Sequence, residues 1–158
     1  MIVYHGSTEI IKNPDVLHSK KYLDFGKGFY ITTFENQAKK WAVRKGMRQE
    51  KTAIVNIYEL SEKWDDYRVL SFEKENEKWL DFVCGCRKGQ PLNEAFDIII
   101  GNVADDDVFK TVDMYFRGLW DKEKVLNELR YYKMNNQICI VNQETLNQLI
   151  TFKRAYEV

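Results

Sequence analysis

The order of strand-like and helix-like segments limits the folds open to this chain more than any other feature of its sequence. Apolar and β-branched segments predict strands at residues 1–5, 29–33, 52–60, 67–72, 96–101, 137–141 and 152–158. Helical spacing of apolar residues predicts helices at 35–45, 74–87, 108–119, 122–132 and 143–150. The two kinds of segment are interspersed without the regular alternation of a doubly wound sheet, so we expect an α+β fold.

Length and hydropathy indicate the class of protein. The chain has 158 residues, enough to bury a core, and we expect residues 1–158 to form a single domain. No apolar run approaches the roughly 18 residues of a membrane span, and the first residues lack the pattern of a signal peptide. The sequence therefore predicts a cytoplasmic protein without a membrane partner.

The charges of the chain balance overall but not locally. There are 24 Lys and Arg against 24 Asp and Glu, yet residues 1–60 carry 10 against 6 and residues 61–110 carry 7 against 12. The basic excess includes Lys39, Lys40, Arg44, Lys45 and Arg48, a face that is either simply solvated or able to receive a phosphate-rich ligand. A net charge of zero gives no reason to expect duplex nucleic acid as a partner.

The cysteines and histidines are too few and too scattered for a metal site. Cys84, Cys86 and Cys139 form no CxxC pair, and the only histidines are His5 and His18. An odd, small number of cysteines in a chain of this class favours free thiols. We expect Cys86 on the apolar face of a helix, Cys139 inside a strand, and no bound metal.

The glycine-rich stretch DFGKGFYITTF, residues 24–34, leads into a strand rather than a helix. It lacks the third glycine of a dinucleotide-binding fingerprint and the GK[ST] of a P-loop. Gly26 and Gly28 therefore predict a tight entry into the strand rather than a phosphate cradle. Strand alternation puts Phe29 and Tyr30 on opposite faces, so that one lies in the core and the other faces out or into a cleft.

His5 ends the first predicted strand and is followed by Gly6 and Ser7. A lone histidine after an apolar strand is typical of a structural residue. A glycine next to it lets a ligand approach the backbone, whose N–H and C=O can then bond an amide. The residues alone leave both interpretations open.

Three short segments, taken together, resemble a known family of enzymes. YHGS at 4–7, FGKGFYIT at 25–32 and NNQICIV at 135–141 are similar, in order and in strand context, to the three signature segments of the poly(ADP-ribose) polymerase-like ADP-ribosyltransferases. The chain also resembles a family of small uncharacterised bacterial proteins that share DFGKGFY and a following Trp-Ala pair. The resemblance implies a split antiparallel β-sheet core with surrounding helices, which grips NAD⁺ in a folded-over conformation.

The same resemblance implies roles for individual residues. His5 would bond the adenosine-side ribose, the Gly6 backbone the nicotinamide amide, and Tyr30 would lie against the nicotinamide ring. Trp41 stands at the offset of a second ring-stacking aromatic, although a place in the helix core is the alternative. Aromatic faces attract the nicotinamide of NAD⁺ because it is a flat cationic ring. The other residues assigned to the NAD⁺ pocket are Ser7, Gly28 and Phe29.

The chain departs from the resembled enzymes at two positions. Gln137 stands where they usually have a glutamate, and Ala38 where many offer a hydroxyl to the nicotinamide amide. Gln137 can hydrogen-bond a ribose hydroxyl, but it carries no charge and cannot act as a base. Another carboxylate could supply what is missing, and the candidates are Asp24, the run Asp105–Asp107 and Glu144.

These features predict a mono-ADP-ribosyltransferase that uses NAD⁺ to modify a macromolecule or a small molecule, with His5, Tyr30 and Gln137 as its catalytic residues. One alternative is a catalytically silent module that binds NAD⁺ or ADP-ribose, motivated by Gln137. Another is a partner-binding scaffold with a relic cleft, which would not bind NAD⁺. Small bacterial transferases of the resembled type are often toxins, which implies an antitoxin-like protein as a partner.

Overall fold

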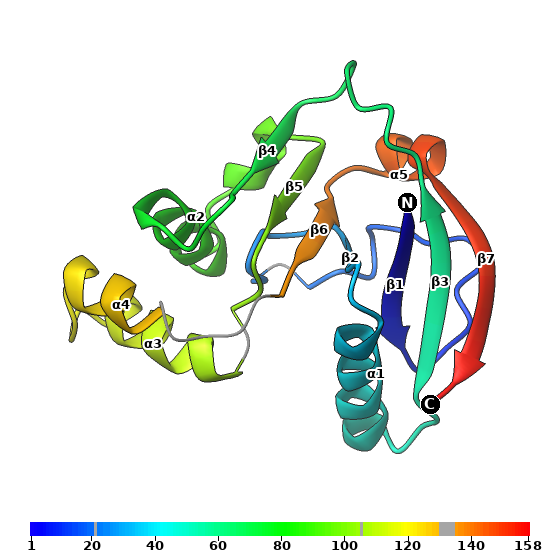
Figure 1. The fold of residues 1–158 in the computed structure, drawn as a ribbon, viewed down its shortest axis with the longest axis horizontal. Coiled ribbons are helices and arrows are strands. Elements are labelled where there is room, and N and C mark those ends of the chain that lie inside the picture. The colour runs from blue at the N-terminus through cyan, green and yellow to red at the C-terminus, as the bar shows by residue number, and fades with distance from the viewer. Residues whose placement is uncertain (21, 105, 130–134) are drawn as a thin grey trace.

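A three-stranded antiparallel sheet carries the first and the last strand of the chain (Figure 1). The computed structural model describes residues 1–20, 22–104, 106–129 and 135–158. In this sheet β1 (Ile2–Ser7) and β7 (Ile150–Glu157) both pair with the central β3 (Ile54–Leu60). The central position of β3 agrees with its largely apolar composition, and most of its side chains are buried.

A second, four-stranded sheet has the order β2–β6–β5–β4. Its strands are β2 (Phe29–Ile31), β6 (Gln137–Ile140), β5 (Ile98–Gly101) and β4 (Val69–Ser71). β6 pairs antiparallel with both β2 and β5, whereas β4 runs parallel to β5. The apolar run of β5 is largely buried, as the sequence predicts for an inner strand of a sheet.

Within the described residues, one bridge joins the two sheets, between β1 and the residue that follows β2. The N–H of Tyr4 donates to the carbonyl of Thr32 at 2.8 Å, and the N–H of Thr32 donates back to Tyr4 at 3.0 Å. On one side of this bridge the two strands separate, and β1 continues in the first sheet while β2 continues in the second. A shared core of Val3, Phe29, Tyr58, Ile140 and Leu146 packs between them.

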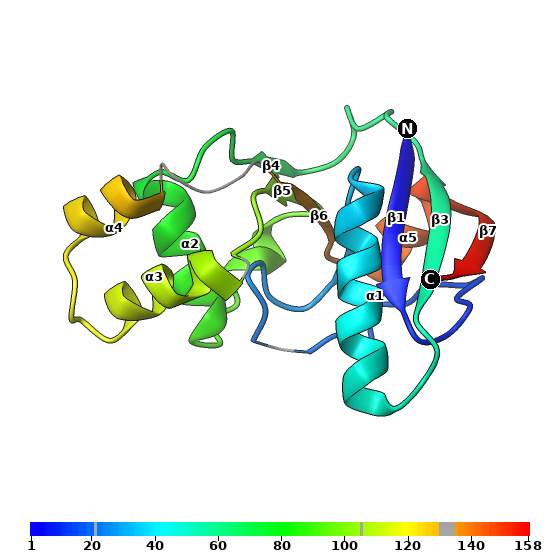
Figure 2. The same cartoon turned by 60° about the horizontal axis from the view of Figure 1, so that its bottom comes forward.

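One long helix covers the outer face of the first sheet. Helix α1 (Glu35–Gln49) lies along β1, as the two views show (Figures 1 and 2). Its buried residues Ala38 and Ala42 pack in one cluster with Val55 and Ile57 of β3. Small side chains on this face of α1 let the helix approach the strand closely.

Three of the other helices lie beside the second sheet (Figures 1 and 2). Figure 2 shows α2 (Glu77–Arg87), α3 (Asp106–Phe116) and α4 (Lys122–Leu129) grouped at the end of the molecule away from α1. A 3₁₀ turn at Leu92–Ala95 and the short helix α5 (Gln143–Leu149) complete the fold. Among the described helices, none is long and apolar enough to cross a membrane.

The α+β class and the type of each predicted element are confirmed, whereas the expected antiparallel core is wrong for one pair, because β4 runs parallel to β5. The differences lie at element ends: α1 extends to Gln49 rather than 45, α2 begins at Glu77 rather than 74, and α3 spans Asp106–Phe116 rather than 108–119, so that it begins inside the predicted loop 102–107. The predicted helix at 122–132 is present to Leu129, and its last residues lie outside the described part of the chain. The sequence gives no signal for the 3₁₀ turn after Pro91.

Candidate functional site

A large cavity opens where β1 and β2 diverge. Its volume is about 1370 Å³, above the roughly 300–1,000 Å³ of ordinary small-molecule sites. His5 and Ser7 of β1, Phe29 and Tyr30 of β2, Trp41 of α1 and Gln137 of β6 all line it. The topology therefore brings the three short sequence segments, which are far apart in the chain, to one cavity.

His5 is held as a neutral ring. It stacks on Phe29 with ring centroids 4.6 Å apart, and its Nδ1 lies 2.7 Å from the carbonyl oxygen of Tyr30. A carbonyl can only accept, so Nδ1 carries the proton and donates. Removal of the ring from water lowers the pKa of His5 from 6.5 to about 4. The neutral tautomer leaves Nε2 as a hydrogen-bond acceptor at the cavity.

Gly6 is required by close packing as well as by its place at the split between the sheets. A Cβ on Gly6 would lie 2.2 Å from the carbonyl oxygen of Ala38 and 2.6 Å from the amide nitrogen of Ala42. Because Tyr4 bonds Thr32 with both backbone groups, strand alternation directs the N–H and C=O of Gly6 to the same side of β1. The sequence suggested ligand approach alone as the reason for this glycine, and the structure adds the approach of α1.

Trp41 lies on the cavity wall, close to Gly6. Its side chain is partly buried, and it lines the cavity rather than joining the buried clusters formed by the described residues. Of the two interpretations of Trp41, a wall residue with an accessible ring describes it better than a core residue. An aromatic surface in a cavity offers a stacking platform for a flat ring.

Phe29 and Tyr30 lie on opposite faces of β2, as strand alternation predicts. Phe29 is buried in the core between the sheets, whereas Tyr30 packs against the core cluster of α2 and α3 and also lines the cavity. The Tyr30 hydroxyl donates to the carbonyl of Gly26 at 2.5 Å and accepts from the N–H of Phe25 at 3.0 Å. Burial raises the pKa of Tyr30 well above 10. The hydroxyl thus fixes the glycine-rich loop, and it stays protonated.

The glycines of that loop serve backbone geometry. Gly26 has a φ of 75°, the left-handed region that favours glycine. A Cβ on Gly28 would lie 2.4 Å from the Sγ of Cys139 and 2.8 Å from the carbonyl oxygen of Ile140, so its hydrogen lets β2 meet β6. The predicted tight entry into the strand is confirmed. Gly28 also lines the cavity.

Gln137 is buried at the start of β6, with a side chain that is 3% exposed. Its Nε2 donates to Asp24 Oδ2 at 3.0 Å and to the carbonyl of Asn102 at 3.3 Å. The position that departs from the resembled enzymes therefore contacts a carboxylate from the glycine-rich loop.

Asp24 is the one described candidate carboxylate that reaches the site. Arg87 donates from Nε to Asp24 Oδ1 at 2.9 Å and from its second nitrogen to the same oxygen, and the N–H of Ala104 donates to Oδ2 at 2.9 Å. Glu144 is exposed on α5 and lines no described cavity. Asp105 lies outside the described residues, as do the side chains of the two aspartates that follow it.

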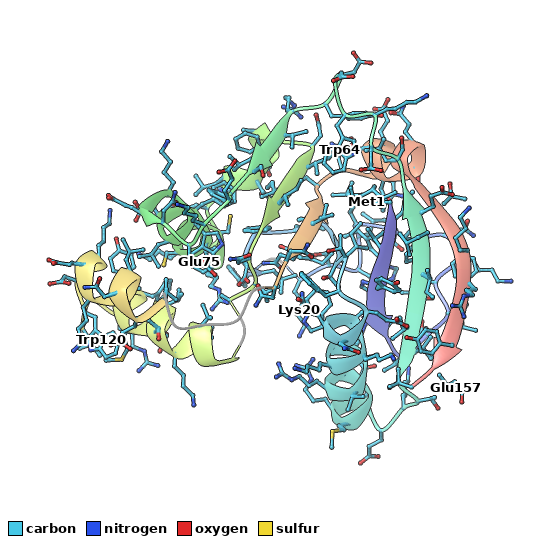
Figure 3. All side chains as sticks on the ribbon, in the orientation of Figure 1. Met1, Lys20, Trp64, Glu75, Trp120 and Glu157 are labelled. Carbon is cyan, nitrogen blue, oxygen red and sulfur yellow. The ribbon has the colours of Figure 1, made fainter. Side chains whose placement is uncertain are left out.

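Positive charge gathers along the rim of the cavity. Lys12, Lys20, Lys45 and Lys51 line it, and Figure 3 labels Lys20 between α1 and the start of β6. The Nζ of Lys45 lies 3.4 Å from the Oγ of the buried Ser7. Burial and the nearby cations Arg48, Lys20 and Lys51 lower the pKa of Lys45. Glu9 and Asp15 line the same cavity, and Glu9 pairs with Lys51, so the positive excess is smaller than four charges, but it still suits an anionic ligand.

Several residues that shape the site carry little signal in the sequence. Arg87 and Ala104 hold Asp24, and the carbonyl of Asn102 holds Gln137. Asn56, buried within β3, accepts from the N–H of Ile11 at 2.8 Å and donates to the carbonyl of Glu9 at 2.9 Å, which fixes one wall of the cavity. A buried asparagine inside the apolar run TAIVNIYEL is the one signal that could have been noticed.

The cysteines are buried and free, as predicted. Burial raises the pKa of both Cys86 and Cys139 to about 12, so these thiols are not activated nucleophiles. No cluster of three or more metal-ligating side chains occurs within the described residues.

Comparison with known proteins identifies a family. The chain belongs to the family described as a protein of unknown function, DUF3990, whose model matches residues 1–152. No curated protein matches the chain.

Proposed function

We propose that this member of the DUF3990 family is an NAD⁺-dependent mono-ADP-ribosyltransferase. The observation that carries the proposal is the convergence of His5, Tyr30 and Gln137, from three distant segments, on one cavity at the divergence of two sheets. The resemblance of the same segments to the poly(ADP-ribose) polymerase-like transferases gives that convergence a chemical meaning. The fold and the cavity alone would not identify the reaction that the protein catalyses.

Each part of NAD⁺ has a proposed partner of suitable chemistry in or next to the cavity. Nε2 of the neutral His5 accepts a hydrogen bond from a hydroxyl of the adenosine-side ribose. The backbone of Gly6 bonds the nicotinamide amide, and the rings of Trp41 and Tyr30 face the cationic nicotinamide. Lys45 and its neighbours on the rim balance the two charges of the pyrophosphate.

The reaction breaks the bond between the anomeric carbon and the nicotinamide nitrogen. The electron pair leaves with nicotinamide, which becomes neutral, and positive charge develops on the ribose. An acceptor nucleophile forms the new bond to the anomeric carbon and loses its proton to solvent water. Gln137 bonds a ribose hydroxyl but cannot take up that proton, so we expect single transfer rather than growth of a polymer.

A second candidate function follows from the charged groups near Gln137, which is itself neutral. An oxocarbenium-like transition state gains from a nearby carboxylate, as in glycoside cleavage. Here the nearby carboxylate, Asp24, is paired with Arg87, which weakens its field at the ribose. A module that binds NAD⁺ or ADP-ribose without turnover is therefore the alternative.

The direct test of transfer is incubation of the full chain with NAD⁺ labelled on its adenylate part, with and without a cell lysate. A transferase releases nicotinamide and transfers label to an acceptor. Calorimetric titration with NAD⁺, done in parallel, separates the two candidates, because a silent module binds NAD⁺ without releasing nicotinamide. A chain that neither binds NAD⁺ nor releases nicotinamide contradicts both. Trp41→Ala is a matched variant, since it removes a wall aromatic from outside the buried core and should weaken binding.

A further inference from the structure

The side-chain amide of Gln137 has both of its N–H donors occupied on the protein side. Nε2 donates to Asp24 Oδ2 at 3.0 Å and to the backbone carbonyl of Asn102 at 3.3 Å. The amide oxygen Oε1 forms no hydrogen bond with any residue that the structure describes, although Gln137 lines the cavity. Only an acceptor is left to meet a ligand.

The orientation of this amide is determined by its two partners. A carboxylate oxygen and a backbone carbonyl can only accept, so turning the amide over would set Oε1 against two acceptors and lose both hydrogen bonds. An amide whose partners are hydroxyl groups, which can both donate and accept, could turn over, but this one is held by groups that only accept. Gln137 thereby presents to the cavity what a glutamate would present, an oxygen that accepts.

Asp24 is itself fixed by groups that require it to accept. The N–H of Ala104 donates at 2.9 Å to the same Oδ2 that receives Gln137, and Arg87 donates to the other oxygen. Asp24 is 8% exposed and comes from the loop whose shape Gly26 and the Tyr30 hydroxyl maintain. These contacts join residues 24, 87, 104 and 137, so that the loop, α2 and β6 share one polar network.

We infer that Asp24 is the positioning residue of the proposed transfer, and that it acts by holding the Gln137 amide so that Oε1 faces the ribose of NAD⁺. The inference rests on the proposed function. The carboxylate on the N–H side of the amide also pushes electron density toward Oε1, which strengthens it as an acceptor for a ribose hydroxyl. A glutamine at this position is then compatible with catalysis because Asp24 holds an acceptor oxygen toward the ribose, although its pairing with Arg87 weakens the field of the charge itself.

The substitution Asp24→Asn should turn the Gln137 amide over. The oxygen of the new side chain would be held by the charged Arg87, and its NH₂ would face Gln137, which would rotate to accept and would present its own NH₂ to the ribose. We expect nicotinamide release from NAD⁺ to fall by about tenfold or more in kcat, with KM changed by less than about threefold, because the hydrogen bond strengthens in the transition state.

The double variant Asp24→Asn with Gln137→Glu provides a rescue. A carboxylate at 137 accepts through either oxygen, so it needs no partner to orient it, and kcat should return to within about threefold of the wild type. Gln137→Glu alone sets two carboxylates about 3 Å apart and should be less active than the double variant at neutral pH. Arg87→Met is the matched control: it breaks the same ion pair but leaves Asp24 facing Gln137, so we expect it to lower kcat less than Asp24→Asn does.

A measurement on the unaltered protein covers the case in which a variant does not fold. With ¹⁵N-labelled glutamine, the side-chain NH₂ of Gln137 should exchange with solvent about tenfold or more slowly than that of the exposed Gln148. Exchange as fast as that of Gln148 overturns the inference, and so does Asp24→Asn turnover equal to that of the wild type. A wild-type protein that releases no nicotinamide, while its Gln137 NH₂ is protected, overturns the proposed function instead.

Discussion

His5 keeps a neutral ring because the fold removes it from water and offers a carbonyl, not a carboxylate, as its partner. The pKa is about 4 in the folded protein, against 6.5 for an ordinary histidine. Between these two values the unfolded chain binds a proton that the native protein does not. The stabilising contribution of neutral His5 is therefore complete above about pH 6.5 and is lost as the pH falls toward 4.

This pH dependence can be measured as the free energy of unfolding in urea at pH 7 and pH 4. The wild type should lose about 3 kcal/mol more over this range than His5→Asn, a value that follows from a shift of about 2.5 pKa units. His18→Asn controls for the loss of an exposed imidazole. Parallel curves for the wild type and His5→Asn would contradict the assignment of a neutral ring.

Gln137 illustrates what a single residue does and does not reveal in a sequence. Its identity predicts a missing charge and a missing base, and that much follows from the side chain itself. Its partners at Asp24, Asn102 and, one contact further, Arg87 lie 113, 35 and 50 positions away in the chain. No local pattern pairs residues at such separations, so Asp24 could be named only as one of several candidate carboxylates.

At the scale of elements, local pattern was a good guide to type and a poor one to pairing. Apolar runs, glycine turns and helical spacing depend on residues close in sequence, and the predicted strands and helices are present. The division into two sheets, the order β2–β6–β5–β4 and the parallel pair β4–β5 depend on contacts across the whole chain. The 3₁₀ turn Leu92–Ala95 is too short to produce a recognisable periodicity of apolar residues in the sequence.

The contact between β1 and α1 depends on Gly6, and Gly6→Ala tests it. The new Cβ would meet backbone atoms of Ala38 and Ala42, at 2.2 and 2.6 Å, and backbone cannot turn away as a flexible side chain can. We expect a loss of about 3 kcal/mol in the free energy of unfolding, because α1 must shift from the strand.

The control for this variant is Gly118→Ala. An added Cβ there meets nothing within 4 Å, so only the strain of its φ of 74° remains, about 1 kcal/mol. Urea unfolding of the two variants under the same conditions gives the comparison. A Gly6→Ala protein as stable as the wild type would show that α1 does not pack on β1 as described.

At the scale of the whole molecule, a neutral chain carries a basic rim around its main cavity. The local excess of lysine and arginine in residues 1–60 was visible in the sequence, but the gathering of Lys12, Lys20, Lys45 and Lys51 at one opening was not. Two of these lysines come from the segment between β1 and β2, one from α1, and one from the turn before β3. The fold, rather than net charge, brings these lysines together, and the proposed binding of the NAD⁺ pyrophosphate depends on them.

Lys45→Met tests the use of this rim. The variant keeps most of the apolar stem and removes the charge, so we expect the Kd for NAD⁺ to rise about tenfold at low salt. The wild-type affinity should fall as salt is added, and the variant's should fall less steeply. Lys40→Met, on the exposed face of the same helix, should bind as the wild type does. Equal calorimetric affinities for the wild type and Lys45→Met would contradict a pyrophosphate at the rim.

The central claim is that one NAD⁺ molecule occupies the cavity between the two sheets, with its nicotinamide-side ribose at Gln137. A crystal structure of the full chain with NAD⁺, or with an analogue that cannot be cleaved, tests it most directly. The account predicts a ribose hydroxyl within hydrogen-bond distance, about 2.5–3.2 Å, of Gln137 Oε1, and the nicotinamide ring against Trp41 or Tyr30. A dinucleotide bound elsewhere on the molecule, or one whose ribose is turned away from Gln137, would contradict it.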